Sequence, residues 1–288
     1  MSAASAGIAP FGVSEFTTWP LSFEEDVALY RECGVDAIEL CEFKLADGAA
    51  GEDQLRQLKD SGLALASVQP RLHSLFPDAP RPEPADPRER MMRVEATMRR
   101  IGKHFPGATL VSITGAAPRA DFAAAYRTAV EEYGHMARVA EDCGVHLAVE
   151  PLNPILMNAD TFLCTLRQAG RLVEDVDHPS FGLFVDVWHV WEDASAPALI
   201  AKYGPKIFGV HINDWKTPRS FGDRHLPGDG EIPLVPLLQA VRAAGYQGAY
   251  TLEIFSEDHL ENSLWADPQR TVREGRRRFD QLWNQVCA

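Results

Sequence analysis

Short apolar segments alternate with longer amphipathic segments along the chain, and this alternation restricts the fold more than any other feature. Eight segments have the length and composition of buried strands, and eight have the 3.6-residue periodicity of amphipathic helices. We expect strands at about residues 8–14, 35–40, 63–69, 108–114, 145–150, 181–186, 206–212 and 249–254. We expect helices at about residues 22–33, 52–61, 88–104, 119–143, 159–175, 196–203, 234–244 and 268–285.

Repeated strand–helix units of this kind imply a parallel sheet with right-handed crossovers. Gly34 and Gly144 stand between an expected helix and the next strand, where glycine commonly ends a helix. An open doubly wound sheet would fit the alternation too, but eight units in 288 residues favour a closed barrel. No Gly-x-Gly-x-x-Gly motif opens the first helix, so a dinucleotide-binding sheet has no support. We therefore predict an α/β fold with one (β/α)8 TIM-barrel domain spanning residues 1–288.

The composition excludes several partners. The formal net charge of −13 disfavours nucleic acid, because binding phosphates requires a basic surface, and it disfavours an anionic membrane surface as well. No apolar stretch approaches the roughly 18 residues that span a bilayer. The five cysteines are scattered and form no Cys-x-x-Cys pair, so we expect a reducing compartment and a cytoplasmic protein. A homo-oligomer is compatible with the sequence.

Four of the expected strands end in a residue that can bind a metal ion. In a parallel barrel the C-terminal ends of all strands meet on one face, which is where such barrels carry their active sites. Three carboxylates and one imidazole converging there would hold one divalent ion. An acid at a strand end can also cap the following helix, so the prediction rests on the full set. The predicted metal ligands are Glu150, Asp186, His211 and Glu253.

Other polar and aromatic residues near the strand ends are candidates for substrate binding. His189 stands three residues after Asp186 and would return to the same face if a helical turn begins there. Arg224 would donate to a substrate oxygen, or else be a solvated loop charge. Trp188 offers an aromatic wall for a sugar ring, or simple packing. Glu39 ends the second strand and either faces the site or caps a helix.

Two loops are long enough to be functional. Residues 70–88 contain six prolines and cannot form a helix or a central strand. Residues 213–233 contain several polar residues and glycines that permit tight turns near a ligand.

The chain resembles, over nearly its whole length and most specifically in its C-terminal half, the sugar phosphate isomerase/epimerase superfamily of xylose-isomerase-like barrels, with ketose 3-epimerases as the template. The segments that carry the resemblance are Val149-Glu150-Pro151, Asp186-Val187-Trp188-His189, Val210-His211-Ile212-Asn213-Asp214, Arg224-His225-Leu226-Pro227-Gly228-Asp229-Gly230 and Leu252-Glu253. The resemblance implies that Glu150, Asp186, His211 and Glu253 bind Mn²⁺, with Mg²⁺, Co²⁺ or Zn²⁺ as alternatives. It also implies that His189 and Arg224 hold substrate oxygens.

The segment from His211 to His225 also resembles the endonuclease IV branch of the superfamily, in which an Asp-x-His pair helps to bind a third zinc ion. Here that pair would be Asp223 and His225. The branch also needs histidines after strands 3 and 4, and this chain has none in place, although His73 is close. We therefore expect the trinuclear site to be incomplete.

The predicted chemistry is proton transfer beside a carbonyl through a metal-stabilised enediolate, with Glu150 and Glu253 as the catalytic acid–base pair. This describes a sugar isomerase or epimerase acting on a small sugar or keto-sugar. The first alternative is a lyase or dehydratase that expels a beta leaving group from a keto-sugar, keto-inositol or 3-keto-glycoside, with His189 or His225 as the acid. The second alternative is a non-catalytic sugar-binding barrel.

Overall fold

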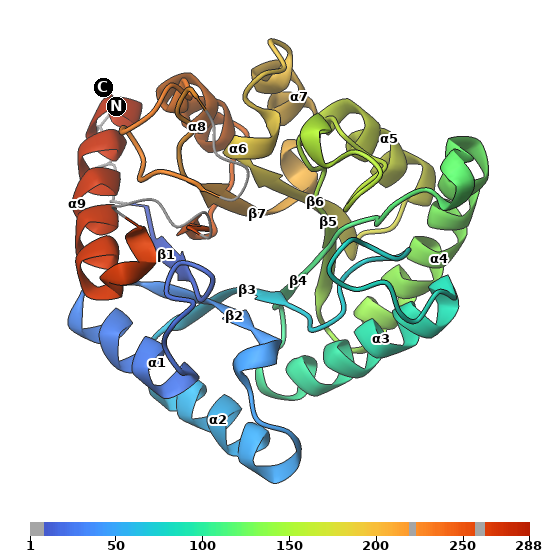
Figure 1. The fold of residues 1–288 in the computed structure, drawn as a ribbon, viewed down its shortest axis with the longest axis horizontal. Coiled ribbons are helices and arrows are strands. Elements are labelled where there is room, and N and C mark those ends of the chain that lie inside the picture. Colours follow the sequence, from blue (N-terminus) through green and yellow to red (C-terminus); the bar gives the residue numbers. More distant parts are fainter. Residues whose placement is uncertain (1–8, 219–222, 257–262) are drawn as a thin grey trace, which may run out of the picture.

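The protein forms a closed barrel of eight parallel strands in the order β1 to β8, surrounded by helices (Figure 1). The computed structural model describes residues 9–218, 223–256 and 263–288. Strand β1 pairs with both β2 and β8, and the register Phe11–Tyr250 closes the sheet. The predicted TIM barrel is therefore confirmed. Residue 8 of the expected first strand and residues 219–222 of the second long loop lie outside the described residues.

The strands lie within the expected ranges or end one residue beyond them. They are β1 (Phe11–Ser14), β2 (Ala37–Cys41), β3 (Ala64–Gln69), β4 (Thr109–Ser112), β5 (His146–Val149), β6 (Phe181–Asp186), β7 (Ile207–Ile212) and β8 (Tyr250–Leu252). The helices are α1 (Phe23–Glu32), α2 (Gly48–Asp60), α3 (Pro87–His104), α4 (Phe122–Asp142), α5 (Leu166–Val176), α6 (Val187–Val190), α7 (Ala196–Tyr203), α8 (Leu234–Ala243) and α9 (Pro268–Cys287).

Side-chain caps explain where several helices begin. Ser22 and Glu25 form a capping box at α1, and Asp86 caps α3 just before Pro87. The predicted start of a helix at residue 159 is wrong, because Thr165 accepts a hydrogen bond from the Gln168 backbone and caps α5 there. The preceding residues instead form an irregular segment. Gly34 and Gly144 have φ of +67°, as expected for residues that end a helix.

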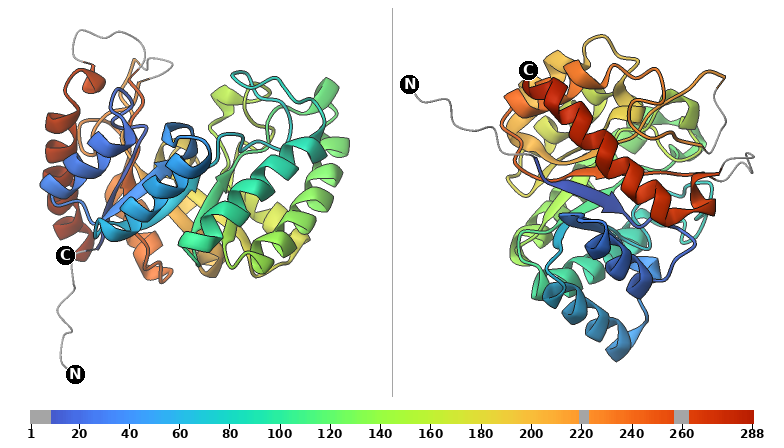
Figure 2. Two further views of the ribbon diagram at one scale, coloured as in Figure 1. Left: turned by 90° about the horizontal axis from the view of Figure 1, so that it is seen from below. Right: turned by 90° about the vertical axis from the view of Figure 1, so that its left-hand side faces the viewer.

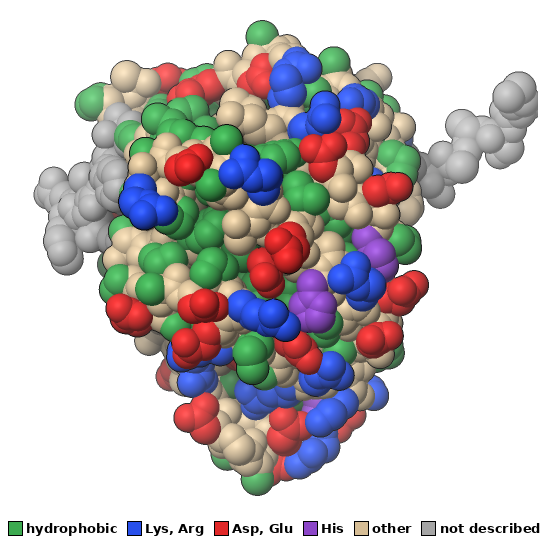
Figure 3. Space-filling view, turned by 90° about the vertical axis from the view of Figure 1, so that its right-hand side faces the viewer, with side chains coloured by type: hydrophobic (Ala, Val, Ile, Leu, Met, Phe, Trp, Pro, Cys, Tyr) green, Lys and Arg blue, Asp and Glu red, His purple; other side chains and the backbone are tan. Residues whose placement is uncertain are grey.

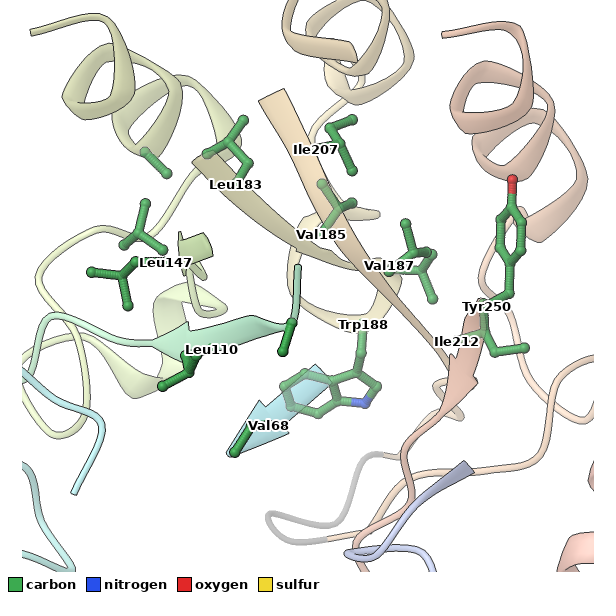
Figure 4. Close-up of a cluster of buried hydrophobic side chains, with 14 of the residues drawn as sticks. Val68, Leu110, Leu147, Leu183, Val185, Val187, Trp188, Ile207, Ile212 and Tyr250 are labelled. Atoms are coloured by element: carbon green, nitrogen blue, oxygen red, sulfur yellow. The ribbon is translucent and has the colours of Figure 1, made fainter. Parts of the chain in front are cut away.

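Aliphatic and aromatic side chains fill the space between the barrel and its helices. Figure 4 shows part of this core, with side chains contributed by β3 to β8 and by α6. The C-terminal helix α9 lies beside β1 in Figure 2, and the rings of Phe11 and Phe279 pack with centroids 5.2 Å apart. Inside the barrel, Val111, Ala148 and Phe184 form a separate buried cluster. This cluster lies beneath the strand ends that carry the predicted ligands.

The helical surface carries charges of both signs. Acidic and basic side chains are interspersed on the face shown in Figure 3, and on α3 they form i,i+4 pairs such as Arg93–Glu89 and Arg99–Glu95. Each such pair stabilises its helix by roughly 0.2–0.5 kcal/mol. Of the helices in the described part of the chain, none is both long and apolar enough to cross a membrane.

The proline-rich loop after β3 is irregular, as predicted, and a buried arginine anchors it. Between β3 and α3 the described backbone makes a single isolated bridge, from Ser74 to Ile113. Arg90 of α3 is fully buried and donates to the backbone oxygens of Ser74 (2.9 Å) and Pro84 (2.9 Å). A fixed guanidinium with several acceptors replaces the regular hydrogen bonds that this loop lacks.

Candidate metal centre

The four predicted metal ligands meet at the C-terminal ends of β5 to β8. Glu150 and Glu253 directly follow β5 and β8, Asp186 ends β6, and His211 lies near the end of β7. All four side chains are buried. His211 Nδ1 lies 3.4 Å from Glu150 Oε1, 3.3 Å from Glu253 Oε2 and 3.9 Å from Asp186 Oδ2. Three carboxylates thus surround one imidazole nitrogen.

Two atoms at the centre of this cluster are buried without a hydrogen-bond partner. They are Glu150 Oε1 and His211 Nδ1. Buried polar atoms normally have hydrogen-bond partners. These two atoms lie 3.4 Å apart among the carboxylates, so their lack of partners needs an explanation. Two sets of side chains place their ligand atoms within 4.8 Å of one another, Glu39–His211–Glu253 and Glu150–Asp186–His211. The donor set of carboxylate oxygens and one imidazole fits a divalent cation.

Glu39 supports His211 from the side opposite the carboxylate cluster. Its Oε2 lies 2.8 Å from His211 Nε2 and accepts a hydrogen bond from Ser67 Oγ at 2.5 Å. An acceptor on Nε2 fixes the ring and leaves Nδ1 to face the other ligands. Phe184 holds the ring from below, with centroids 4.4 Å apart. Glu39 is fully buried and does not line the cavity described below, so its contacts favour orienting His211 over touching substrate.

Arg224 reaches into the cluster from the loop after β7. Its Nη1 donates to Asp186 Oδ2 at 2.7 Å and also contacts Glu253 Oε2. The guanidinium carbon lies 4.8 Å from the ring centre of Phe255 and 5.1 Å from that of Trp188. Burial alone would lower the pKa of Arg224, but the carboxylates of Asp186 and Glu253 outweigh it and raise the pKa. The alternative that Arg224 is a solvated loop charge is therefore wrong, since its side chain is buried at the centre of the site.

The pKa values of the three acids are shifted in different directions, because burial raises each of them and neighbouring charges oppose it to different extents. Burial raises the pKa of Glu253 to about 8 against the opposing charges of His211 and Arg224. The pKa of Glu150 is raised for the same reason. For Asp186, the nearby Arg224 and histidines overcome burial and lower the pKa. The cluster therefore contains one firmly ionised carboxylate and two carboxyl groups that bind protons more tightly than free acids.

His189 is a buried histidine beside the ligand cluster. The one-turn helix α6 returns it to the site, as expected from its spacing after Asp186. The backbone N–H of Asn153 donates to Nδ1 at 3.0 Å, and Arg224 Nη2 lies 3.3 Å from Nε2, so both ring nitrogens face N–H donors. Burial lowers the pKa of His189 to about 3, which keeps the ring uncharged at neutral pH. Its Nε2 lies 3.7 Å from Asp186 Oδ2, beside the ligand cluster.

A cavity of about 720 Å³ opens above the cluster. Its volume is within the range of about 300–1,000 Å³ typical of small-molecule sites. The predicted residues that line it are Glu150, Trp188, His189, Arg224 and Glu253. Sequence reasoning did not assign a role to other lining residues, including Phe16, Phe43, Arg81 and Phe255. The available signal was an aromatic residue two or three positions after a strand, at Phe16, Phe43 and Phe255.

The residues that suggested a third metal ion are placed differently. Asp214 pairs with His225 through the backbone, and its carboxylate accepts from the N–H groups of Gly228 and Gly230. This carboxylate therefore shapes the loop. Within the described ranges, neither group of residues able to hold a metal includes Asp223, His225 or His73. His225 also does not line the cavity, which leaves His189 as the histidine of the two acid candidates that does.

The barrel and its buried acid–histidine cluster define a class of TIM-barrel proteins with a candidate divalent-metal centre at the strand ends. A sequence model of the xylose isomerase-like TIM barrel family matches residues 27–282, and the chain belongs to this family.

Characterised relatives of the chain include enzymes of two kinds. It is 30% identical over 132 residues to a D-psicose 3-epimerase of Ruminiclostridium cellulolyticum, covering 45% of this chain and 41% of that enzyme. It is 30% identical over 130 residues to a 3-dehydroshikimate dehydratase of Pseudomonas putida, covering 38% of this chain and 20% of that enzyme. The chain thus spans less than half the length of these relatives.

A solved structure extends the similarity over the barrel. Protein SMc04130 from Sinorhizobium meliloti 1021 superposes with a TM-score of 0.83 and 26% identity, covering 96% of this chain and 99% of that one.

Proposed function

We propose that this protein is a divalent-metal-dependent isomerase or epimerase that moves a proton next to the carbonyl of a sugar or keto-sugar. The observation that carries the proposal is the pair Glu150 and Glu253, which line the same cavity and both lie within 3.4 Å of His211 Nδ1. A carboxyl group held beside a reacting carbon can accept a proton and return it. The relatedness to a D-psicose 3-epimerase supports this assignment.

The two glutamates would exchange protons with the substrate carbon from different directions. Glu150 follows β5 and Glu253 follows β8, so the two carboxyl groups enter the cavity from separate parts of the barrel rim. One glutamate removes the proton beside the carbonyl, and the other returns one to the opposite face, which inverts that carbon. If one glutamate performs both transfers, the outcome is aldose–ketose isomerisation.

Neighbouring residues would bind and orient the substrate oxygens. Glu150, Asp186, His211 and Glu253 would hold a divalent ion, Mn²⁺ being our first choice, which when bound polarises a carbonyl oxygen as a Lewis acid. His189 would contact a substrate oxygen, and Arg224 would donate to one through its guanidinium. Trp188 would exclude water from one wall of the cavity. We expect a cytoplasmic enzyme with a small-molecule substrate and no nucleic-acid partner.

Elimination is the second candidate. The similarity to a 3-dehydroshikimate dehydratase favours it, because the same proton removal can expel a leaving group beta to the carbonyl. His189 would then assist the departing group, since its side chain lines the cavity beside the ligand cluster.

The test is hydrogen exchange in deuterated water. The metal-loaded protein is incubated with free ketoses, keto-inositols and 3-keto-glycosides, and the small molecules are separated and analysed by NMR. Deuterium at a carbon beside the carbonyl, with the carbon skeleton intact, is the expected result. Loss of water or of an aglycone would assign the protein to elimination. Absence of exchange with every compound, in protein shown to hold metal, would contradict proton transfer on these substrates and revive a non-catalytic sugar-binding barrel.

A further inference from the structure

Four aromatic residues that line the cavity pack against one another. Phe16, Trp19, Phe43 and Phe255, which we call the aromatic wall, come from the loops after β1, β2 and β8. Phe16 contacts the other three rings, with centroids 5.9 Å from Trp19, 5.4 Å from Phe43 and 4.7 Å from Phe255. The wall is therefore one continuous surface.

The aromatic wall runs from the metal centre to the solvent. At its inner end, Phe255 lies against the guanidinium of Arg224, which contacts the ligands Asp186 and Glu253. At its outer end, the side chain of Trp19 is 45% exposed, which is unusual for so large an apolar residue. A ligand held at the metal centre could thus extend along the rings to the cavity mouth.

The outer rings are held in place. Trp265 lies behind Trp19 in a stacked arrangement, with centroids 6.4 Å apart. The indole N–H of Trp265 donates to the backbone oxygens of Phe16 (2.9 Å) and Ile254 (3.3 Å). The N–H group of Trp265 therefore has its hydrogen-bond partners within the protein. An exposed aromatic surface that the protein fixes in this way is preorganised for contact with a flat apolar group.

We propose that the substrate carries an apolar, planar substituent that lies on the aromatic wall, so that it is an aryl-substituted sugar rather than a free monosaccharide. This inference rests on the proposed function, because it places the reacting ring at the metal centre. A second sugar ring could stack on these rings through its apolar face, but its hydroxyl groups would find no partners on the phenylalanine side chains, whereas a planar aryl ring matches the apolar surface over its whole face. A phenyl ring loses nothing polar on the same surface.

A second group of lining residues would hold the hydroxylated part of the substrate. It comes from the end of β3 and the loops after β3 and β5, and consists of the polar side chains of Gln69, His73, Arg81 and Asp160, which we call the polar wall. The hydroxylated ring would occupy the part of the cavity between this polar wall and the metal centre, and the aryl group would lie toward Trp19. The sequence of the chain thus encodes a cavity with two chemically distinct groups of lining residues.

The test measures binding without turnover. Phenyl β-D-glucoside and methyl β-D-glucoside differ only in the substituent, and neither has a carbonyl group that could react. Their Kd values are measured by calorimetry with the full chain in excess Mn²⁺. We expect the wild type to prefer the phenyl compound by roughly tenfold, and the Trp19→Ala variant to lose that preference. Trp19→Phe should retain most of it. Phe122→Ala is the control, because Phe122 is similarly exposed (43%) but does not line this cavity.

The outcomes separate this inference from the proposed function. Equal affinity of the wild type for both glucosides, no binding of either, or an unchanged preference in Trp19→Ala would overturn the aromatic wall as a substituent site. A phenyl preference that depends on Trp19 would support it even if the exchange experiment on sugars failed. Conversely, exchange with free ketoses and no phenyl preference would retain the isomerase and reject the aryl substituent.

Discussion

Two groups of buried acids lie close to strand ends in this barrel, and they differ in what compensates their charge. Glu15 directly follows β1, just as Glu253 directly follows β8, and both side chains are buried. Glu15 Oε2 accepts from the backbone N–H of Cys41 at 2.6 Å. Its neighbour Asp26 accepts from Lys44 Nζ at 2.6 Å. We call Glu15, Asp26 and Lys44 the lysine-paired cluster; it has its own cation and does not line the cavity.

The metal centre holds three carboxylates, Glu150, Asp186 and Glu253, with one arginine and one histidine. Carboxylate oxygens without a hydrogen-bond partner occur in both clusters, at Glu150 Oε1 in the metal centre and at Glu15 Oε1 and Asp26 Oδ1 in the lysine-paired cluster. Glu150 and Glu253 also line an open cavity. An acid at the end of a strand is therefore not sufficient to define a site. Both clusters contain a cationic side chain, and the distinction lies in the open cavity beside the metal centre, which leaves room for a mobile cation.

The strongest test of this comparison removes one carboxylate from the metal centre. Asp186→Asn and Glu253→Gln keep the side-chain shape but remove a charge that a divalent ion needs. We expect Mn²⁺ affinity to fall steeply and the rate of hydrogen exchange to fall by at least about a thousandfold, since the ion contributes several kcal/mol to charge stabilisation. Removal of metal with EDTA should have the same effect on the wild type, and added Mn²⁺ should reverse it.

Asp160→Asn is the matched control for these variants. Asp160 lines the same cavity but accepts a hydrogen bond from the backbone of Ala79 and stands outside the ligand cluster. It should bind Mn²⁺ as the wild type does. Unchanged metal affinity in Asp186→Asn and Glu253→Gln would show that the cluster is only a buried ion-pair network.

The reciprocal test removes the cation from the lysine-paired cluster. In Lys44→Met the buried carboxylate of Asp26 loses its partner, so we expect the free energy of unfolding to fall by about 3–5 kcal/mol. Mn²⁺ affinity should stay within about twofold of the wild-type value, because this cluster is separate from the metal ligands. Urea unfolding and calorimetry measure the two quantities. If Lys44→Met does not fold, Lys44→Arg is measured instead. Because it keeps the charge, its free energy of unfolding should fall by less than that of Lys44→Met.

Lys202→Met provides the control for an ordinary surface pair. Lys202 contacts Glu174 at 2.7 Å, but both side chains are about half exposed, at 55% and 44%. Its removal should cost less than about 1 kcal/mol. A similar loss in Lys202→Met and Lys44→Met would contradict the claim that burial gives the lysine-paired cluster its importance.

The fold could be predicted from the sequence because the same pattern, a short apolar strand followed by an amphipathic helix, recurs eight times. Each apolar run is short and each helix is amphipathic, so errors at single boundaries do not alter the order of elements. The boundary error at α5 shows the limit of this signal. The residues before Thr165 have a mixed composition that fits a helix, and only the capping contact to Gln168 decides where the helix begins.

The candidate site could be predicted from the sequence only in part. Glu150, Asp186, His211 and Glu253 are each the last or next residue of an apolar run, which a sequence displays directly. The role of Glu39 beside His211 depends on pairing across the barrel, and a linear pattern does not show which imidazole nitrogen it faces. The aromatic wall likewise forms only where three separate loops converge, so no local sequence motif predicts it.

The last prediction concerns His73, a buried histidine that stays uncharged in the folded protein. His73 lies in the polar wall of the cavity, where burial and the neighbouring charge of Arg81 lower its pKa to about 3. The folded protein therefore keeps this ring neutral, whereas the unfolded chain takes up a proton as the pH falls below about 6.5. The contribution of His73 to stability is complete above that pH and is lost progressively as the pH falls toward 3. Between pH 7 and pH 5 it amounts to about 2 kcal/mol.

Replacing this histidine should make the protein less sensitive to acid. Urea unfolding at pH 7 and pH 5 gives the loss in free energy of unfolding for the wild type and for His73→Gln, and the loss should be smaller in the variant by about 2 kcal/mol. Other titrating groups contribute equally to both proteins, so the difference isolates His73. His135→Gln is the control, because His135 is exposed on α4 and should lose as much stability as the wild type. An equal acid sensitivity in His73→Gln and the wild type would mean that His73 is charged in the folded protein, in which case the polar wall of the cavity is more cationic than its contacts indicate.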